Sequence, residues 1–157
     1  MEAVIFIGIQ ATGKSTFYKE RFYHSHVRIS LDMLRTRNRE DILLEAVIRA
    51  KAAFVVDNTN VLKLERAKYI RAAKPAGYRV VGYYFESLLQ DALRRNQQRE
   101  GRAAVASEAL RNKIHHLQPP SYAEGFDALY FVSINPQGGF IVHDWPEPAS
   151  GEPEQTA

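Results

Sequence analysis

Short apolar segments alternate along this chain with segments whose apolar residues recur at helical spacing. The apolar, strand-like segments cover residues 3–7, 27–29, 54–56, 78–85 and 128–134. The helical spacing is clearest at Ile42, Leu44, Val47 and Ile48, and again at Leu64, Ala67 and Ile70. This alternation predicts an α/β domain with a five-stranded, mostly parallel sheet flanked by helices.

The last part of the chain has a different composition. From Pro146 onward, three prolines stand among Ser, Gly and Glu residues. Such segments bury too little apolar surface to offset the entropy lost on folding. We therefore expect one folded domain over residues 1–145 and a disordered, acidic tail over residues 146–157.

The overall composition is that of a globular protein. The chain has 157 residues, of which 45% are hydrophobic and 25% charged, enough for one domain with a core. It has no cysteine, which excludes disulfides and thiolate metal sites and suits a reducing cytoplasm. Because no apolar run approaches the length of a membrane span, we expect a cytoplasmic protein with no membrane partner.

The octapeptide GIQATGKS, from Gly8 to Ser15, follows the first apolar segment and matches the P-loop pattern of phosphate-binding proteins. Gly8 and Gly13 are expected to adopt positive φ angles and bring backbone N–H groups close to phosphate oxygens. Lys14 would contact the β and γ phosphates of a nucleotide, and the Ser15 hydroxyl would bind Mg²⁺. Thr16 continues the nucleotide-binding segment, although its main role is expected to be helical. The alternative is an ordinary glycine-containing turn with an exposed lysine.

Net charge agrees with an anionic ligand without selecting one. The chain carries a formal charge of +3, and the glutamates of its tail have no basic neighbours there, so the rest is more basic still. A basic domain suits polyanions such as ATP and nucleic acid, although many basic proteins bind neither specifically.

The second apolar segment is followed by the sequence SLDMLR, at the end of a strand where open α/β sheets bind ligands. Asp32 is a candidate general base that accepts a proton from an attacking hydroxyl group. Its alternative role is that of a helix N-cap. Arg35 would bind a substrate phosphate, or form an ion pair with Asp32 on one helical face.

The third apolar segment is followed by Asp57, Asn58, Thr59 and Asn60. Asp57 occupies the place where P-loop proteins often carry the carboxylate that holds Mg²⁺ through water, although Asp-Asn is also a common turn pair. Asn58, Thr59 and Asn60 are candidates for orienting the substrate and for capping the next helix. Because all three polar segments follow strands of one parallel sheet, we expect them to converge on one crevice.

Arginines are concentrated over residues 94–102. Arg95 and Arg99 are one helical turn apart and share a face, so both are candidates for a lid that closes on nucleotide phosphates. An arginine that reaches the transferred phosphate stabilises the charge of the transition state. The alternative is a solvated helix face.

Taken together, these residues resemble the kinase domain of the polynucleotide 5′-hydroxyl kinase family over nearly all of the chain. The segments that carry the resemblance, in the family's order, are residues 8–16, 28–35, 56–60, 92–99 and 124–127. The resemblance implies a P-loop kinase fold with a helical lid, in which Asp32 is the general base and Arg35 holds a substrate phosphate. It also implies that Arg95 and Arg99 belong to the lid, with Lys14, Asp32 and Arg99 as catalytic residues. The implied reaction transfers the γ-phosphoryl group of ATP to a nucleic acid 5′-hydroxyl end with Mg²⁺.

The chain departs from this family at two places. Gln10 and Ala11 stand where the family's P-loop commonly has a proline and a further glycine. A phosphatase or ligase module, which larger members carry, has no room in this length. Two other functions agree with the same residues: a kinase for a small hydroxyl-bearing metabolite, nucleoside or nucleotide sugar, and an ATP-binding switch without phosphoryl transfer.

Overall fold

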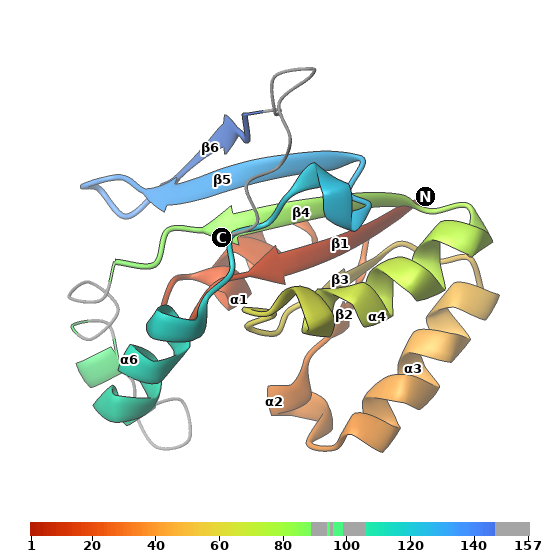
Figure 1. The fold of residues 1–157 in the computed structure, drawn as a ribbon, viewed down its shortest axis with the longest axis horizontal. Helices are drawn as coiled ribbons and strands as arrows, with labels where there is room; N and C mark the ends of the chain where they lie inside the picture. The colour runs from red at the N-terminus through yellow and green to blue at the C-terminus, as the bar shows by residue number, and fades with distance from the viewer. Residues whose placement is uncertain (89–93, 95, 99–105, 147–157) are drawn as a thin grey trace.

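A six-stranded sheet lies at the centre of the molecule, with strand order β2-β3-β1-β4-β5-β6 (Figure 1). The computed structural model describes residues 1–88, 94, 96–98 and 106–146. The strands are β1 (Glu2–Ile7), β2 (Val27–Ile29), β3 (Phe54–Val56), β4 (Arg79–Phe85), β5 (Ala128–Ile134) and β6 (Phe140–Asp144). The first five are parallel to their neighbours, and β6 is antiparallel to β5. The α/β P-loop fold predicted from the sequence is confirmed.

The strand β6 is a correction to the predicted sheet of five strands. A tight turn precedes it, in which Asn135 N–H donates to the Gly139 carbonyl at 2.7 Å and the Asn135 side chain accepts from Gly139 N at 2.8 Å. Gly138 supplies the positive φ of 87° within this turn. Phe140, Ile141 and Val142 form an apolar run as long as the segment 54–56, so the signal for this strand is present in the sequence although its residues are exposed or only partly buried.

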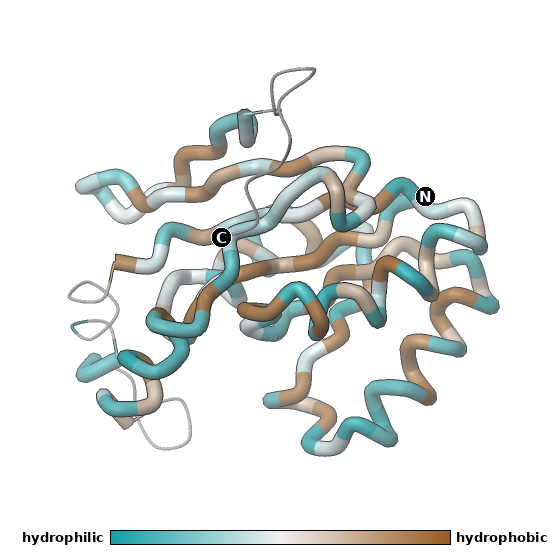
Figure 2. The backbone as a smooth tube through the Cα atoms, viewed as in Figure 1, coloured by the Kyte–Doolittle hydropathy of each residue, from teal (hydrophilic) through white to brown (hydrophobic). Residues whose placement is uncertain are grey.

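The central strand β1 explains why the strands appear as continuous apolar runs. Its side chains alternate between two cores on opposite faces of the sheet. Ile5 and Ile7 belong to the core beneath the helices α3 (Arg37–Arg49) and α4 (Lys63–Ala73). Phe6 belongs to an aromatic core on the other face, beneath the helix α1 (Lys14–Arg21). Figure 2 shows the apolar residues concentrated along this central part of the sheet.

The remaining elements connect these layers. They are α2 (Leu31–Leu34), η1 (Lys74–Ala76), α6 (Ser107–His116) and η3 (Tyr122–Glu124). Within the described part of the chain, no helix is long and apolar enough to cross a membrane.

The apolar face predicted for α4 is partly wrong. Leu64 is 78% exposed, whereas the buried face of α4 consists of Arg66, Tyr69, Ile70 and Ala73. A hydrophobic pattern discounts an arginine, and Arg66 at 0% exposure shows that a fully paired arginine occupies a core position here. In α3, Leu44 and Val47 are buried as predicted, but Ile42 is 60% exposed, so the predicted face is wrong at that position.

Candidate functional site

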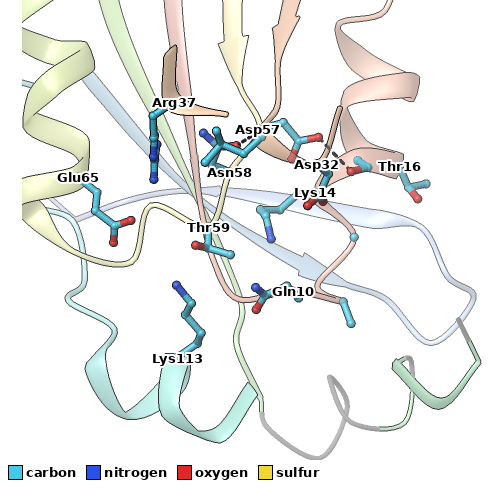
Figure 3. Close-up of a pocket in the computed structure, with 14 residues that line it drawn as sticks. Gln10, Lys14, Thr16, Asp32, Arg37, Asp57, Asn58, Thr59, Glu65 and Lys113 are labelled. Carbon is cyan, nitrogen blue, oxygen red and sulfur yellow. Dashed lines mark hydrogen bonds between the residues drawn. The ribbon is translucent and has the colours of Figure 1, made fainter. Parts of the chain in front are cut away.

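A cleft of about 470 Å³ opens beyond the carboxyl ends of β1, β2 and β3. Residues from all three polar segments singled out in the sequence line it, so they converge as expected (Figure 3). The lining residues are Gln10, Ala11, Gly13, Lys14, Ser15, Thr16, Leu31, Asp32, Arg37, Asp57, Asn58, Thr59, Glu65 and Lys113.

The two P-loop glycines are needed for different reasons. Gly13 has a φ of 92° and precedes α1, and a Cβ there would lie 3.0 Å from Cε1 of Phe140 in β6. Gly8 is not among the positive-φ residues, so the predicted turn conformation is wrong for it. A Cβ at Gly8 would lie 3.0 Å from the Cβ of Phe85, so close packing against β4 disfavours a side chain there.

Ala11 adopts a left-handed conformation, with a φ of 63°. This is the region of the loop where the resembled family commonly has a proline and a further glycine. A left-handed conformation costs an L-residue other than glycine about 1–2 kcal/mol. The loop therefore keeps a backbone shape that favours glycine while carrying an alanine.

Lys14 is buried and folded over its own loop. Its Nζ donates to the Ile9 carbonyl at 2.6 Å, and the Thr12 hydroxyl donates to the same oxygen at 2.9 Å. The P-loop is also fixed from outside, because Gly8 N–H donates to the Thr59 carbonyl at 2.9 Å. Lys14 thus lines the cleft with its ammonium group at the loop that would surround a phosphate.

Ser15 and Asp57 meet as predicted from their positions after β1 and β3. The Ser15 hydroxyl donates to Oδ2 of Asp57 at 3.0 Å. Arg28 of β2, to which the sequence assigned no separate role, donates from Nε to the same Oδ2 at 2.9 Å and from Nη2 to the Ser15 hydroxyl at 3.0 Å. A hydroxyl beside a carboxylate is the oxygen donor set that suits a hard divalent cation such as Mg²⁺. The signal for Arg28 was its polar side chain in the middle of a three-residue strand.

Asp32 and Arg35 are separated by the structure. Ser30, in extended conformation, is the N-cap of α2, so the alternative role of Asp32 as N-cap is wrong. Asp32 lies in the first turn, exposed, and lines the cleft. Arg35 follows the last helical residue with a φ of 74°, is exposed, and is not among the lining residues. The predicted shared helical face of Asp32 and Arg35 is therefore absent, because α2 ends at Leu34.

Asn58 connects the cleft to the helices behind it. Its Oδ1 accepts from Leu31 N–H at 2.9 Å, and its Nδ2 donates to Glu40 at 3.0 Å and to the Tyr69 hydroxyl at 3.3 Å. Both ends of the amide are thus engaged by the protein. Asn58 lines the cleft and fixes the beginning of α2, next to Asp32.

Glu40 is a buried carboxylate that the sequence analysis missed. It is 0% exposed and accepts hydrogen bonds from Lys68 at 3.0 Å, Tyr69 at 2.8 Å and Asn58 at 3.0 Å. Arg37 Nη1 lies 3.2 Å from the same carboxylate. Burial by itself raises the pKa of Glu40, but the hydrogen bonds from Lys68, Tyr69 and Asn58 outweigh it and hold the pKa below its usual value.

Arg66 is a second buried charge that the sequence did not reveal. Its guanidinium forms two hydrogen bonds with Glu124, of 2.8 and 3.0 Å, and donates to the carbonyls of Asn60 and Gln118 at 2.9 Å each. The Asn60 side chain in turn donates to the Phe6 carbonyl at 2.9 Å. The loop after β3 is therefore held on both sides.

One wall of the cleft is built from residues outside the predicted segments. Arg37 of α3 and Lys113 of α6 point toward one another across the opening, and Glu65 of α4 lies beside them (Figure 3). Glu65 accepts from Leu62 N–H at 3.2 Å and caps its own helix. The lid candidates Arg95 and Arg99 lie outside the described residues.

Comparisons with known proteins place this geometry in a wider group. A family model described as "AAA domain" matches residues 36–120, which is more than half of the chain. This match begins after the P-loop and does not include residues 8–15.

Solved structures share the fold at low sequence identity. Kti12 from Chaetomium thermophilum, in complex with ADP-AlF3, has a TM-score of 0.63 and 17% identity over 83% of this chain and 88% of that chain. A gluconokinase from Sinorhizobium meliloti has a TM-score of 0.57 and 18% identity over 84% and 82%. A structure of the PezAT toxin-antitoxin system of Streptococcus pneumoniae has a TM-score of 0.63 and 12% identity over 89% of this chain and 70% of that chain. The chain therefore belongs to this AAA-domain family, and its fold is that of the P-loop NTPases.

Proposed function

We propose that this protein is a kinase that transfers the γ-phosphoryl group of ATP to a hydroxyl group, and that the acceptor is the 5′-hydroxyl end of a polynucleotide. The observation that carries the proposal is the position of Asp32. It lines the same cleft as Lys14 and Ser15, so a candidate base and a phosphate-binding loop face one space.

Nucleotide binding follows from the P-loop and the helix behind it. Successive backbone N–H groups of the loop and the N-terminus of α1 offer partial positive charge to phosphate oxygens. Lys14 adds a full charge once its ammonium group moves from the Ile9 carbonyl to a phosphate. The similar fold of Kti12, in complex with ADP-AlF3, supports a nucleotide as ligand.

The donors in the cleft also suit Mg²⁺, since Ser15 and Asp57 place a hydroxyl and a carboxylate within 3.0 Å of one another. When bound, Mg²⁺ would neutralise the negative charge that builds up on the leaving phosphate group. Arg28 keeps both oxygen donors in place by bonding to each of them.

The reaction is an in-line displacement at the γ-phosphorus. A bond forms between the acceptor oxygen and the γ-phosphorus, the bond from that phosphorus to the bridging oxygen breaks, and ADP leaves. Asp32 takes the proton of the acceptor hydroxyl, a contribution worth about 10²- to 10⁴-fold in rate. Asn58 keeps Asp32 in position through its bond to Leu31 N–H.

Two observations support the polynucleotide acceptor. The segments that resemble polynucleotide 5′-hydroxyl kinases occur in the family's order, and two of them, around Asp32 and Asp57, meet at the cleft. The charge of +3 also suits a polyanionic acceptor.

A small hydroxyl-bearing metabolite is the second candidate acceptor. A cleft of about 470 Å³ is in the range that small ligands fill. The fold is also shared with a protein named as a gluconokinase.

Label transfer from γ-labelled ATP tests the proposal. The acceptors are 5′-hydroxyl DNA and RNA oligonucleotides, their 5′-phosphorylated counterparts, a nucleoside and gluconate, each with Mg²⁺. We expect transfer to the 5′-hydroxyl oligonucleotides alone, with loss of product in Lys14→Ala and Asp32→Asn. Transfer only to a small molecule would favour the second candidate. ATP binding without transfer to any acceptor would overturn the kinase proposal and favour a switch.

A further inference from the structure

We propose that Arg37 and Lys113 form an anion-binding subsite for the acceptor, a role that the resemblance gave to Arg35. The subsite would hold a phosphate or carboxylate group that the acceptor carries near its reactive hydroxyl. This inference rests on the proposed kinase function, because it places the acceptor in the same cleft as Asp32.

Arg37 is held in place for such a contact. Its Nη1 donates to both oxygens of Glu40, at 3.2 and 3.4 Å, and to the Tyr69 hydroxyl at 3.3 Å. Glu40 is fully buried, whereas the Arg37 side chain is 55% exposed at the cleft. Within the described part of the chain, each of these bonds uses Nη1, which leaves the donors on Nε and Nη2 for a ligand.

Arg37 shares the Glu40 carboxylate with Lys68. Lys68 donates to the same carboxylate at 3.0 Å and also pairs with Asp41. The two cations and two carboxylates of this cluster sum to a formal charge of zero, so Arg37 offers an anion its oriented Nε and Nη2 donors. Because the guanidinium is already oriented, the Arg37 side chain loses less entropy when an anion binds.

Lys113 reaches the cleft from a helix that is anchored to the P-loop. Leu110, one turn earlier in α6, is 0% exposed and packs in a cluster with Ile9 and Val61. Ile9 belongs to the P-loop, and Val61 precedes α4. This cluster fixes which side of α6 faces the P-loop. Lys113 lies on the side of α6 that lines the cleft (Figure 3).

Glu65 is the carboxylate that would compete for these cations. One of its oxygens already accepts from Leu62 N–H, and among the described residues it forms no ion pair with Arg37 or Lys113. Asp32 and Asp57 also line the cleft, but they lie nearer to Lys14 and the P-loop (Figure 3). Two cations that face one space favour an anionic group of the ligand.

Arg35 is poorly placed for the role that the resemblance implies. It stands beyond the end of α2, exposed and outside the lining of the cleft, whereas Arg37 is two residues further along and lines it. The left-handed φ of 74° at Arg35 turns the chain between the two helices. Because of this turn, the arginine that faces the cleft is Arg37 and not Arg35.

Binding to the full chain, with ADP and Mg²⁺ present, tests the subsite by calorimetry. The probes are a nucleoside 3′-monophosphate, the same nucleoside without phosphate, and gluconate. We expect Arg37→Ala and Lys113→Ala each to raise the Kd of the charged probe about tenfold or more, and to change that of the neutral nucleoside less than twofold. Arg49→Ala in α3 and Arg111→Ala in α6 remove the same charge at exposed positions outside the cleft and should change neither. The charged probe that wild type binds more tightly identifies phosphate or carboxylate as the source.

Several outcomes would overturn the subsite. These are a larger loss in Arg35→Ala than in Arg37→Ala, equal losses for charged and neutral nucleosides, or no binding of either charged probe to wild type. If thermal melting shows that an alanine variant is unfolded, Arg37→Gln replaces Arg37→Ala and Lys113→Met replaces Lys113→Ala, with the same expected changes in Kd.

Label transfer to the charged acceptors separates the subsite from the kinase proposal. Arg37-dependent binding without any phosphoryl transfer would support the subsite and overturn the kinase. Transfer with an unchanged KM for the charged acceptor in Arg37→Ala would overturn the subsite and leave the kinase intact.

Discussion

Arg28 and Asp57 form a salt bridge of 2.8 Å that joins β2 to the loop after β3, directly behind the P-loop. The Asp57 side chain is only 2% exposed, and Arg28 bonds to the Ser15 hydroxyl as well. One strand residue thereby fixes two oxygens that belong to separate segments. The pair links the stability of the fold to the geometry of the cleft.

Replacing Arg28 by glutamine should leave the Asp57 carboxylate buried without its cation. We expect Arg28→Gln to lower the free energy of unfolding by about 2 kcal/mol, measured by urea denaturation. Arg49→Gln, at an exposed position of α3, is the matched control and should change it by less than about 0.5 kcal/mol. Equal effects of the two substitutions would contradict the role of this pair.

Ala11→Gly should stabilise the protein despite adding a glycine. The left-handed φ of 63° costs alanine about 1–2 kcal/mol, and the greater entropy of unfolded glycine offsets part of that gain. We expect the urea midpoint to rise, with a gain of about 0.5 kcal/mol. Gly13→Ala is the opposite case, because it combines a φ of 92° with a close contact to Phe140, and should lose at least about 1 kcal/mol. A loss of stability in Ala11→Gly would contradict the strained conformation.

Glu40→Gln removes the charge that Lys68, Tyr69, Asn58 and Arg37 surround. We expect a loss of about 3 kcal/mol in the free energy of unfolding, because the buried donors keep their positions without a carboxylate. The comparison is Glu45→Gln on the exposed side of the same helix, which should be nearly neutral. Similar urea midpoints for the two variants would rule out a central role for Glu40.

Acid should destabilise the wild type through the same residue. Hydrogen bonds hold the pKa of folded Glu40 below its ordinary value of 4.5, so the unfolded chain takes up a proton first as pH falls. The stabilisation is fully present above pH 4.5 and is lost as pH falls toward the folded pKa. Asp127 acts in the same direction, because Lys74 and Val80 N–H lower its pKa. Urea midpoints between about pH 6 and pH 3 should fall less steeply in Glu40→Gln than in wild type, and parallel slopes would exclude this linkage.

Asp32→Asn should separate catalysis from stability. Asp32 is exposed, so we expect an unchanged urea midpoint. As a general base, it should affect kcat by about 10²- to 10⁴-fold with little change in ATP affinity. Glu20→Gln, an exposed carboxylate of α1 outside the cleft, is the control for kinetics. Wild-type turnover in Asp32→Asn would exclude the proposed base.

Local patterns predicted the elements better than they predicted the wall of the cleft. The apolar segments gave five of the strands, and the P-loop placed Lys14 and Ser15 at the start of α1. The convergence with Asp57 followed from the common direction of parallel strands, since the loops after β1 and β3 must open at the same edge. β6 was missed although Phe140, Ile141 and Val142 form an apolar run, and the structure pairs it antiparallel with β5.

The phosphate-binding loop, the fold class and the three polar segments can be predicted from local sequence, because each is encoded by residues close together in the chain. Only the tertiary structure decided which charged residues are buried and which face the cleft. In the sequence, nothing distinguishes Glu40 and Arg66 from surface charges. Their partners, Lys68 of α4 and Glu124 of η3, are brought to them only by the fold. Arg35 and Arg37 are equally charged in the sequence, and the turn after α2 decides that only Arg37 lines the cleft. The energy of a charge depends on its partners and its solvent, which long-range contacts set.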